Sequence, residues 1–110
     1  MSPENEKKLL EAFPELYSMY DSPPTESCMC WGFEVPDEWF DVLWWLSEQL
    51  HNYSREHNIE INAAQVKEKF GTLRFYLEPI MCSEDQYRDI YDFITFAETK
   101  ILSLHNKGNK

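Results

Sequence analysis

Three of the ten basic residues of the chain lie within eight positions, at Lys67, Lys69 and Arg74. The planar guanidinium of an arginine donates paired hydrogen bonds to a phosphate or carboxylate, and a lysine adds a point charge. Tyr76 follows two positions after Arg74 and offers a ring on which a flat ligand can stack. These four residues predict a binding site for an anionic ligand of the nucleotide type. The alternative is a solvated strand face whose basic side chains pair with acidic neighbours.

The basic residues fall in a segment with the pattern of a β-hairpin. Residues 65–70 and residues 73–77 are predicted to pair as antiparallel strands across Gly71 and Thr72. Because side chains alternate between the two faces of a strand, the four candidate ligand-binding residues then share one face. Pro79 is expected to end the second strand.

Metal binding and catalysis are not indicated by the remaining reactive residues. Cys28 and Cys30 form a single Cys-x-Cys pair and Cys82 stands alone, which is not the spacing of a zinc finger. The odd cysteine count indicates free thiols. No GxSxG, HExxH or phosphate-binding loop motif is present. We therefore predict a protein that is not an enzyme and that holds neither a metal nor a cofactor.

Helix signals flank the hairpin on both sides. Ser2 followed by Pro3 predicts a helix that runs to about Ala12, and a second helix is expected over residues 37–57. The segment 83–86 reads Ser-Glu-Asp-Gln, a capping box that opens a last helix. The order helix-helix-strand-strand-helix predicts an α+β fold with the helices on one face of a small antiparallel sheet. We expect a single domain over residues 1–105 and a disordered tail over 106–110.

Several aromatic side chains fall outside the predicted core positions. On the second helix, a stripe at helical spacing accounts for the core, namely Trp39, Leu43, Leu46, Leu50 and Tyr53. Trp44 and Trp45 flank this stripe, and Phe96 lies opposite the buried stripe of the last helix. Soluble monomers rarely expose so much apolar surface, so these three residues predict an interface of a homo-oligomer or with a partner protein.

The net charge of −10 is concentrated in the first half of the chain. Residues 1–60 carry thirteen acidic and three basic side chains, whereas residues 61–110 carry seven of each. Such a surface repels nucleic acid and anionic membranes and attracts a basic protein. The charged start of the chain lacks the pattern of a signal peptide, and no apolar run is long enough to span a membrane. These features predict a cytoplasmic protein.

Two motifs resemble a family of small uncharacterised proteins encoded by bacteriophages, prophages and bacteria. The residues from Gln65 to Tyr76 read QVKEKFGTLRFY, which is similar to the signature of that family. The upstream residues Phe33-Glu34, Asp37 and Trp39 to Asp41 are similar to its first motif, which usually reads FECGDGW. Together the motifs cover a minor part of the chain, in the expected order.

The chain departs from this family at three places. Val35 and Pro36 stand where the family often has Cys-Gly, and Glu38 stands where it often has Gly. The paired cysteines that many members carry near the C-terminus are absent. The resemblance implies a phage or prophage setting and the cytoplasm of a bacterial host, but no particular chemistry.

Two functions are consistent with these observations. The first is a non-enzymatic protein that antagonises antiviral defence by sequestering an anionic nucleotide-type molecule at the basic hairpin. The alternative is an inhibitor whose acidic first half imitates DNA and blocks a nucleic-acid-binding defence enzyme. The first explains the concentrated basic motif and the second explains the net charge.

Overall fold

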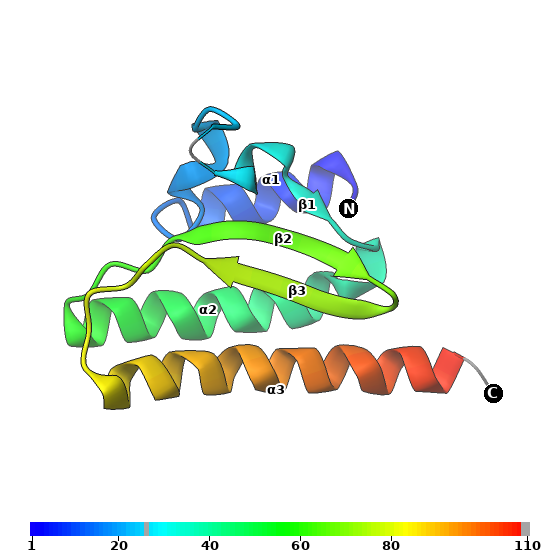
Figure 1. The fold of residues 1–110 in the computed structure, drawn as a ribbon. Helices are drawn as coiled ribbons and strands as arrows, with labels where there is room; N and C mark the ends of the chain where they lie inside the picture. Colours follow the sequence, from blue (N-terminus) through cyan, green and yellow to red (C-terminus); the bar gives the residue numbers. More distant parts are fainter. Residues whose placement is uncertain (26, 109–110) are drawn as a thin grey trace.

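Three helices and a three-stranded mixed sheet make up the fold (Figure 1). The computed structural model describes residues 1–25 and 27–108. The α+β class and the order helix-helix-strand-strand-helix are as predicted. The helices are α1 (Pro3–Ala12), α2 (Phe40–His57) and α3 (Glu84–Gly108), and the strands are β1 (Phe33–Glu34), β2 (Ala63–Lys69) and β3 (Thr72–Leu77).

The helix ends form as the sequence signals predict. The Ser2 hydroxyl accepts a hydrogen bond from the backbone N–H of Asn5 (3.3 Å), and Pro3 occupies the first position of α1. Ahead of α3, the backbone N–H of Ser83 donates to Gln86 Oε1 (3.1 Å) and that of Gln86 donates to Ser83 Oγ (3.2 Å). This reciprocal pair is the predicted capping box. The tail predicted over 106–110 overlaps α3, which continues to Gly108, and residues 109–110 lie outside the described part.

The prediction of a purely antiparallel sheet is wrong, because β1 joins β2 in parallel. Phe33 pairs with Val66 and Glu34 with Lys67. The Glu6 carboxylate of α1 accepts a hydrogen bond from the backbone N–H of Phe33 (3.2 Å). Gly32 precedes the strand with a φ of 75°, and a side chain there would meet the Glu6 carboxylate at 2.9 Å. The strand therefore depends on α1.

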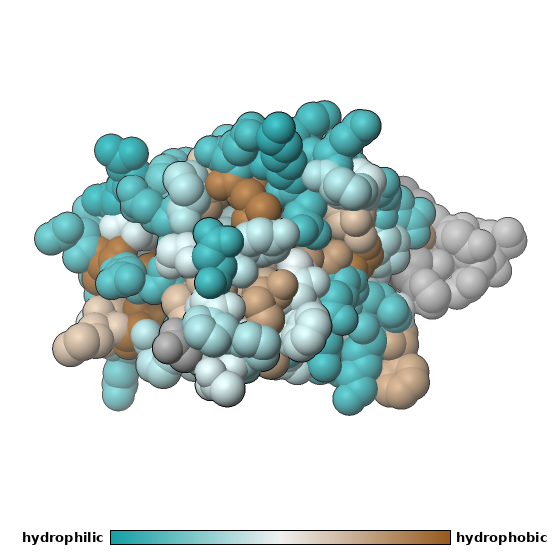
Figure 2. All heavy atoms as spheres, turned by 90° about the horizontal axis from the view of Figure 1, so that it is seen from above, coloured by the Kyte–Doolittle hydropathy of each residue, from teal (hydrophilic) through white to brown (hydrophobic). Residues whose placement is uncertain are grey.

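Two short helical turns lie within the segment 18–36. They are η1 (Ser18–Asp21) and η2 (Cys28–Trp31), and η3 (Asp37–Trp39) leads directly into α2. Viewed from above, this side of the molecule is mostly hydrophilic, with apolar surface limited to small separate patches (Figure 2).

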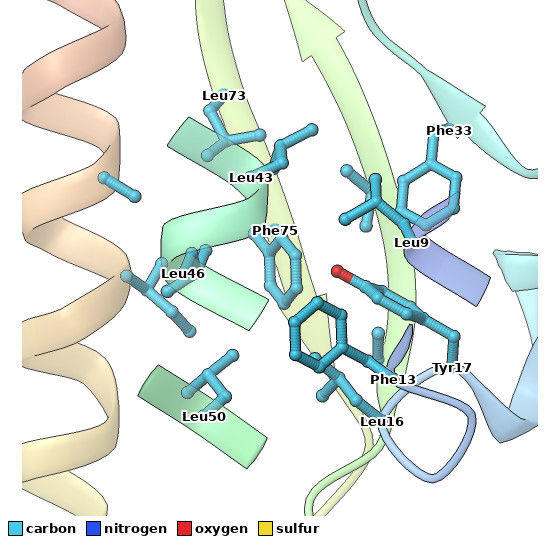
Figure 3. Close-up of a cluster of buried hydrophobic side chains, with 14 of the residues drawn as sticks. Leu9, Phe13, Leu16, Tyr17, Phe33, Leu43, Leu46, Leu50, Leu73 and Phe75 are labelled. Atoms are coloured by element: carbon cyan, nitrogen blue, oxygen red, sulfur yellow. The ribbon is translucent and has the colours of Figure 1, made fainter. Parts of the chain in front are cut away.

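The core lies between the sheet and α1 and α2 (Figure 3). The predicted stripe of α2, including Leu43, Leu46 and Leu50, is buried against Leu73 and Phe75 of β3. Each fully buried leucine contributes about 1.5–3 kcal/mol. Helix α3 runs antiparallel to α2 and alongside β3, on the side of that strand away from β2 (Figure 1). The face of the sheet that points away from this core is not covered by α2.

The buried stripe of α3 is shorter than predicted. Ile90, Ile94, Ala97 and Ile101 are buried, but Tyr87 and Leu104, which continue the same stripe by their helical spacing, are 51% and 43% exposed. They lie near the two ends of α3, and this helix of 25 residues is longer than the 18-residue α2 beside it. The ends of the stripe therefore lack the covering that the middle receives.

Candidate functional site

Four side chains of the β2–β3 hairpin define what we call the basic face: Lys67, Lys69, Arg74 and Tyr76. In the antiparallel ladder Lys67 is directly opposite Arg74, and Lys69 is opposite Thr72. Directly paired residues share a face of the sheet, and positions alternate between the faces. The structure therefore brings together all four residues that the sequence proposed for ligand binding. Val66 and Phe75, which point to the other face, are buried in the core.

The hairpin turn differs from the sequence prediction by one position. Phe70 and Gly71 form the turn, with φ values of 54° and 79°, in place of Gly71 and Thr72. Positive φ at both central residues is the geometry that matches the twist of a two-residue hairpin. The Glu68 carboxylate accepts a hydrogen bond from the Gly71 N–H (2.6 Å), and the Thr72 hydroxyl donates to the Lys69 carbonyl (2.6 Å). The shift does not change which residues share a face.

Arg74 lies partly buried in the middle of the basic face. Its Nε is buried and has no hydrogen-bond partner among the described residues. Leaving a buried donor unpaired costs about 1–3 kcal/mol, and more for a charged group. Within the described part of the chain, Arg74, Lys67 and Lys69 take part in no ion pair. The basic face therefore presents three cationic groups with hydrogen-bonding capacity to spare.

Acidic side chains border the basic face across the strands. Glu34 of β1 is exposed and pairs in register with Lys67 on one flank. On the other flank lies Glu98 of α3, whose pKa is raised by burial, while the neighbouring positive charge of Arg74 works in the opposite direction. Across the strands the charges thus run negative, positive, positive, negative. The sequence did not reveal Glu98 as a neighbour of Arg74, because only the packing of α3 beside β3 brings them close.

Aromatic rings border the basic face along the strands. Tyr76, 45% exposed, lies toward one end, opposite Gln65. At the other end Phe70 is 87% exposed at the hairpin tip. The Nζ of Lys69 lies 5.9 Å from the centroid of the Phe70 ring, which places this ring at the border of the basic face. Phe70 was not singled out from the sequence, although it belongs to the same motif and directly follows Lys69.

The three residues predicted to form an interface do not form one patch. Trp45 packs against Phe96, with ring centroids 4.9 Å apart, between α2 and α3. Both line an apolar hollow of about 280 Å³, together with Asp41, Val42 and Lys100. Trp44 lies elsewhere, against the Phe13 ring at 4.9 Å. It is half-buried and belongs to the packing between α1 and α2.

The cysteines are separate free thiols in the described part of the chain. Cys28 is exposed, whereas Cys30 and Cys82 are half-buried. Among the residues that the structure describes, no group of three or more Cys, His, Asp or Glu side chains could hold a metal ion. Nor does any described helix combine the length and apolar character needed to cross a membrane.

A polar cleft of about 550 Å³ lies where α2 ends, lined by the loop of residues 58–62 and by Glu15, Ser18 and Arg55. Some of its polar groups bond to one another. The Asn62 side-chain amide donates to the Glu15 carbonyl (2.9 Å) and to Ser18 Oγ (3.0 Å). The cleft therefore joins the loop to the segment after α1, and its two carboxylates, Glu15 and Glu60, would oppose an anion. Neither this cleft nor the apolar hollow lies on the basic face.

The fold and this site define an α+β protein with a solvent-facing, basic hairpin. The chain matches no family model, no curated protein and no solved structure.

Proposed function

We propose that the protein is a non-enzymatic binding protein that holds an anionic, nucleotide-type small molecule on the basic face. The observation that carries this proposal is the placement of Lys67 directly across the ladder from Arg74, with neither side chain in an ion pair among the described residues. A phosphate group placed over this pair would accept hydrogen bonds from both side chains. Each hydrogen bond to a charged group is worth roughly 1.5–3 kcal/mol.

The resemblance of the hairpin motif to phage and prophage proteins supports a phage or prophage setting for this function. A small binding protein in that setting antagonises the antiviral defence of the bacterial host by sequestering an anionic molecule that the defence needs. The segment that carries the resemblance, residues 65–76, is also the segment that carries Lys67, Lys69 and Arg74. One short stretch thus supports both the ligand class and the setting.

The test is to identify small molecules released from the protein after purification from bacteria responding to phage infection. Mass spectrometry should find a phosphate-containing compound in stoichiometric amount. The double variant Lys69→Ala/Arg74→Ala should release none. The charge-matched control is Lys7→Ala/Arg88→Ala, which removes two bases that make only exposed pairs, with Glu11 at 3.8 Å and Asp85 at 3.6 Å. Equal loss of ligand in both double variants would contradict the proposal.

A second candidate is inhibition of a nucleic-acid-binding defence enzyme by an acidic, DNA-like surface. It is favoured by the placement of the acids: among the described acidic residues of positions 1–60, all except Glu6 are exposed. A surface rich in exposed carboxylates is attracted to a positively charged site built for phosphates. This candidate predicts a protein purified without a small molecule, and DNA should compete with it for a basic host protein.

A further inference from the structure

The basic face is organised differently along the strands and across them. Across the strands, Glu34 and Glu98 border the central pair of Lys67 and Arg74. Along the strands, the same pair lies between the ring of Tyr76 and the ring of Phe70. The carboxylates therefore repel a phosphate at the centre from two sides, whereas an aromatic ring lies on each of the other two sides. An anionic ligand is best accommodated when its long axis follows β3.

Phe70 is held in a conformation that phenylalanine rarely adopts. Its φ of 54° lies in the left-handed region, where a bulky side chain is an outlier, and its ring is 87% exposed to water. Asparagine or glycine would tolerate both this φ and this exposure to water better. Local strain of this kind persists where surrounding structure enforces it and where function makes use of it. A ring that borders a cationic face can serve as a stacking platform.

We propose that the ligand carries an aromatic ring on each side of a central phosphate, as a dinucleotide does, and that Phe70 stacks on one ring while Tyr76 stacks on the other. This inference rests on the proposed function of the basic face. The distance along β3 from Tyr76 to the turn is roughly 14 Å at about 3.4 Å per residue, so the two bases are splayed apart and not stacked on each other. Gln65, opposite Tyr76, offers an amide to the edge of the nearer base.

The surrounding acids also limit the length of the ligand. A longer oligonucleotide that follows the strand axis would carry further phosphates beyond the rings of Phe70 and Tyr76, along a chain whose net charge is −10. Beyond Lys67, Lys69 and Arg74, each additional phosphate would then add repulsion without a new cationic partner. Affinity should be greatest for the dinucleotide and should not increase with length.

The test compares the wild-type protein with the Phe70→Asn variant by calorimetry, using inorganic phosphate, adenosine monophosphate, adenylyl-adenosine and a longer oligoadenylate as probes. The variant should weaken adenylyl-adenosine binding by about fivefold or more, the lower end expected for one lost stacking contact. Binding of inorganic phosphate should stay unchanged, and adenosine monophosphate, whose one ring can stack on Tyr76, should change little. The variant should also have a higher melting temperature, because asparagine tolerates this φ. Met81→Asn, which changes another apolar side chain that is 94% exposed, is the matched control and should change neither affinity.

The outcomes separate this inference from the proposed function. If Phe70→Asn weakens every probe equally or none, the two-ring ligand is overturned while the basic face remains an anion site. If the longer oligoadenylate binds more tightly than adenylyl-adenosine, the length limit is overturned. If no phosphate-containing probe binds the wild-type protein, the proposed function itself fails.

Discussion

Lys67 lies directly opposite Arg74 in the β2–β3 ladder, with Glu34 beyond Lys67 on β1 and Glu98 of α3 near Arg74. The cationic pair is thus surrounded by carboxylates that lower its net charge without forming ion pairs with it in the described part of the chain. Such an arrangement keeps the hydrogen-bonding groups of both side chains available. It also makes anion affinity sensitive to the charge of the two carboxylates.

Replacing Arg74 with methionine should separate binding from stability. The apolar stem would still pack, and the buried Nε that lacks a partner would be removed. Since an unpaired buried donor costs about 1–3 kcal/mol, the free energy of unfolding should stay equal or increase by about 1 kcal/mol, while anion binding is lost. Urea denaturation and calorimetry measure the two effects.

Lys67→Met is the control for this substitution, because it removes one charge from the paired position on the neighbouring strand. It should weaken anion binding and leave the unfolding free energy unchanged. A large loss of stability in Arg74→Met alone would show that the guanidinium is held by Glu98 in solution, and the anion site would then be occupied by the protein itself.

The charge of Glu98 should set the pH dependence of anion binding. Burial raises the pKa of Glu98, and the nearby Arg74 works against this rise. As the pH falls through this raised pKa, Glu98 takes up a proton and one negative charge next to Arg74 disappears. Sulfate, which does not titrate in this range, should therefore bind more tightly in mild acid. Glu98→Gln should bind it more tightly at neutral pH and show a smaller increase in acid.

Protonation of Glu98 should also change the stability of the fold, and the raised pKa gives the direction of this change. A carboxyl group whose pKa is higher in the folded than in the unfolded state favours folding at low pH, and this contribution is lost as the pH rises through the folded-state pKa. Glu98→Gln should therefore melt at a higher temperature than the wild type at neutral pH. The difference should vanish below the ordinary pKa of glutamate. Glu34→Gln, on the exposed flank, is the matched control, and an identical pH profile in both variants would contradict the role of Glu98.

The parts of the fold that could be predicted from sequence are those specified by neighbours in the chain. The cap at Ser2, the capping box at Ser83 and the alternation of the hairpin all depend on residues a few positions apart, and all are present. The basic face was predictable for the same reason: a strand alternates whatever packs around it.

The parts that could not be predicted depend on contacts between distant segments. Strand β1 is only two residues long, and its N–H at Phe33 is held by Glu6 of α1. The turn at Phe70 could not be read from propensity, because phenylalanine is unfavourable at positive φ. The proximity of Glu98 to Arg74 requires α3 to lie beside β3, which no local pattern specifies.

A buried hydrogen bond joins α2 to the segment after α1. Removing one of its two partners should cost more stability than removing the other. The Tyr17 hydroxyl lies 2.5 Å from Ser47 Oγ, and Ser47 Oγ also donates to the Leu43 carbonyl (2.7 Å). Tyr17→Phe leaves Ser47 with that second partner, whereas Ser47→Ala leaves the Tyr17 hydroxyl buried alone. Ser47→Ala should therefore cost more, about 1–3 kcal/mol in unfolding free energy, and Tyr17→Phe less.

The double variant Tyr17→Phe/Ser47→Ala should recover part of that loss, because neither group is then left unpaired. Burial raises the pKa of Tyr17, so the neutral phenol stabilises the fold, and this stabilisation should decrease as the pH rises above about 10 and the unfolded state ionises. Tyr17→Phe should reduce that alkaline loss. Equal costs for the two single variants would show that the hydroxyl finds another partner.

The apolar hollow between α2 and α3 should mediate self-association. Trp45 and Phe96 line it, and Phe96 is 50% exposed. Asp41 and Lys100 lie at the same hollow without forming an ion pair in the described part of the chain. In a twofold dimer, Asp41 of one copy can therefore face Lys100 of the other, so that the surface is complementary to itself. The nearby charges cancel, although the chain as a whole carries −10.

Light scattering at micromolar concentration should report a dimer that tightens as salt screens the repulsion between the acidic chains. Phe96→Ser should be monomeric, since it removes a half-exposed ring that lines the hollow. Tyr87→Ser is the matched control, because Tyr87 is an aromatic residue of the same helix with a similar exposure of 51% and does not line the hollow. A wild-type monomer in both low and high salt would contradict self-association. The hollow would then be free to contact a host protein, and the acidic inhibitor would become the better account of the protein.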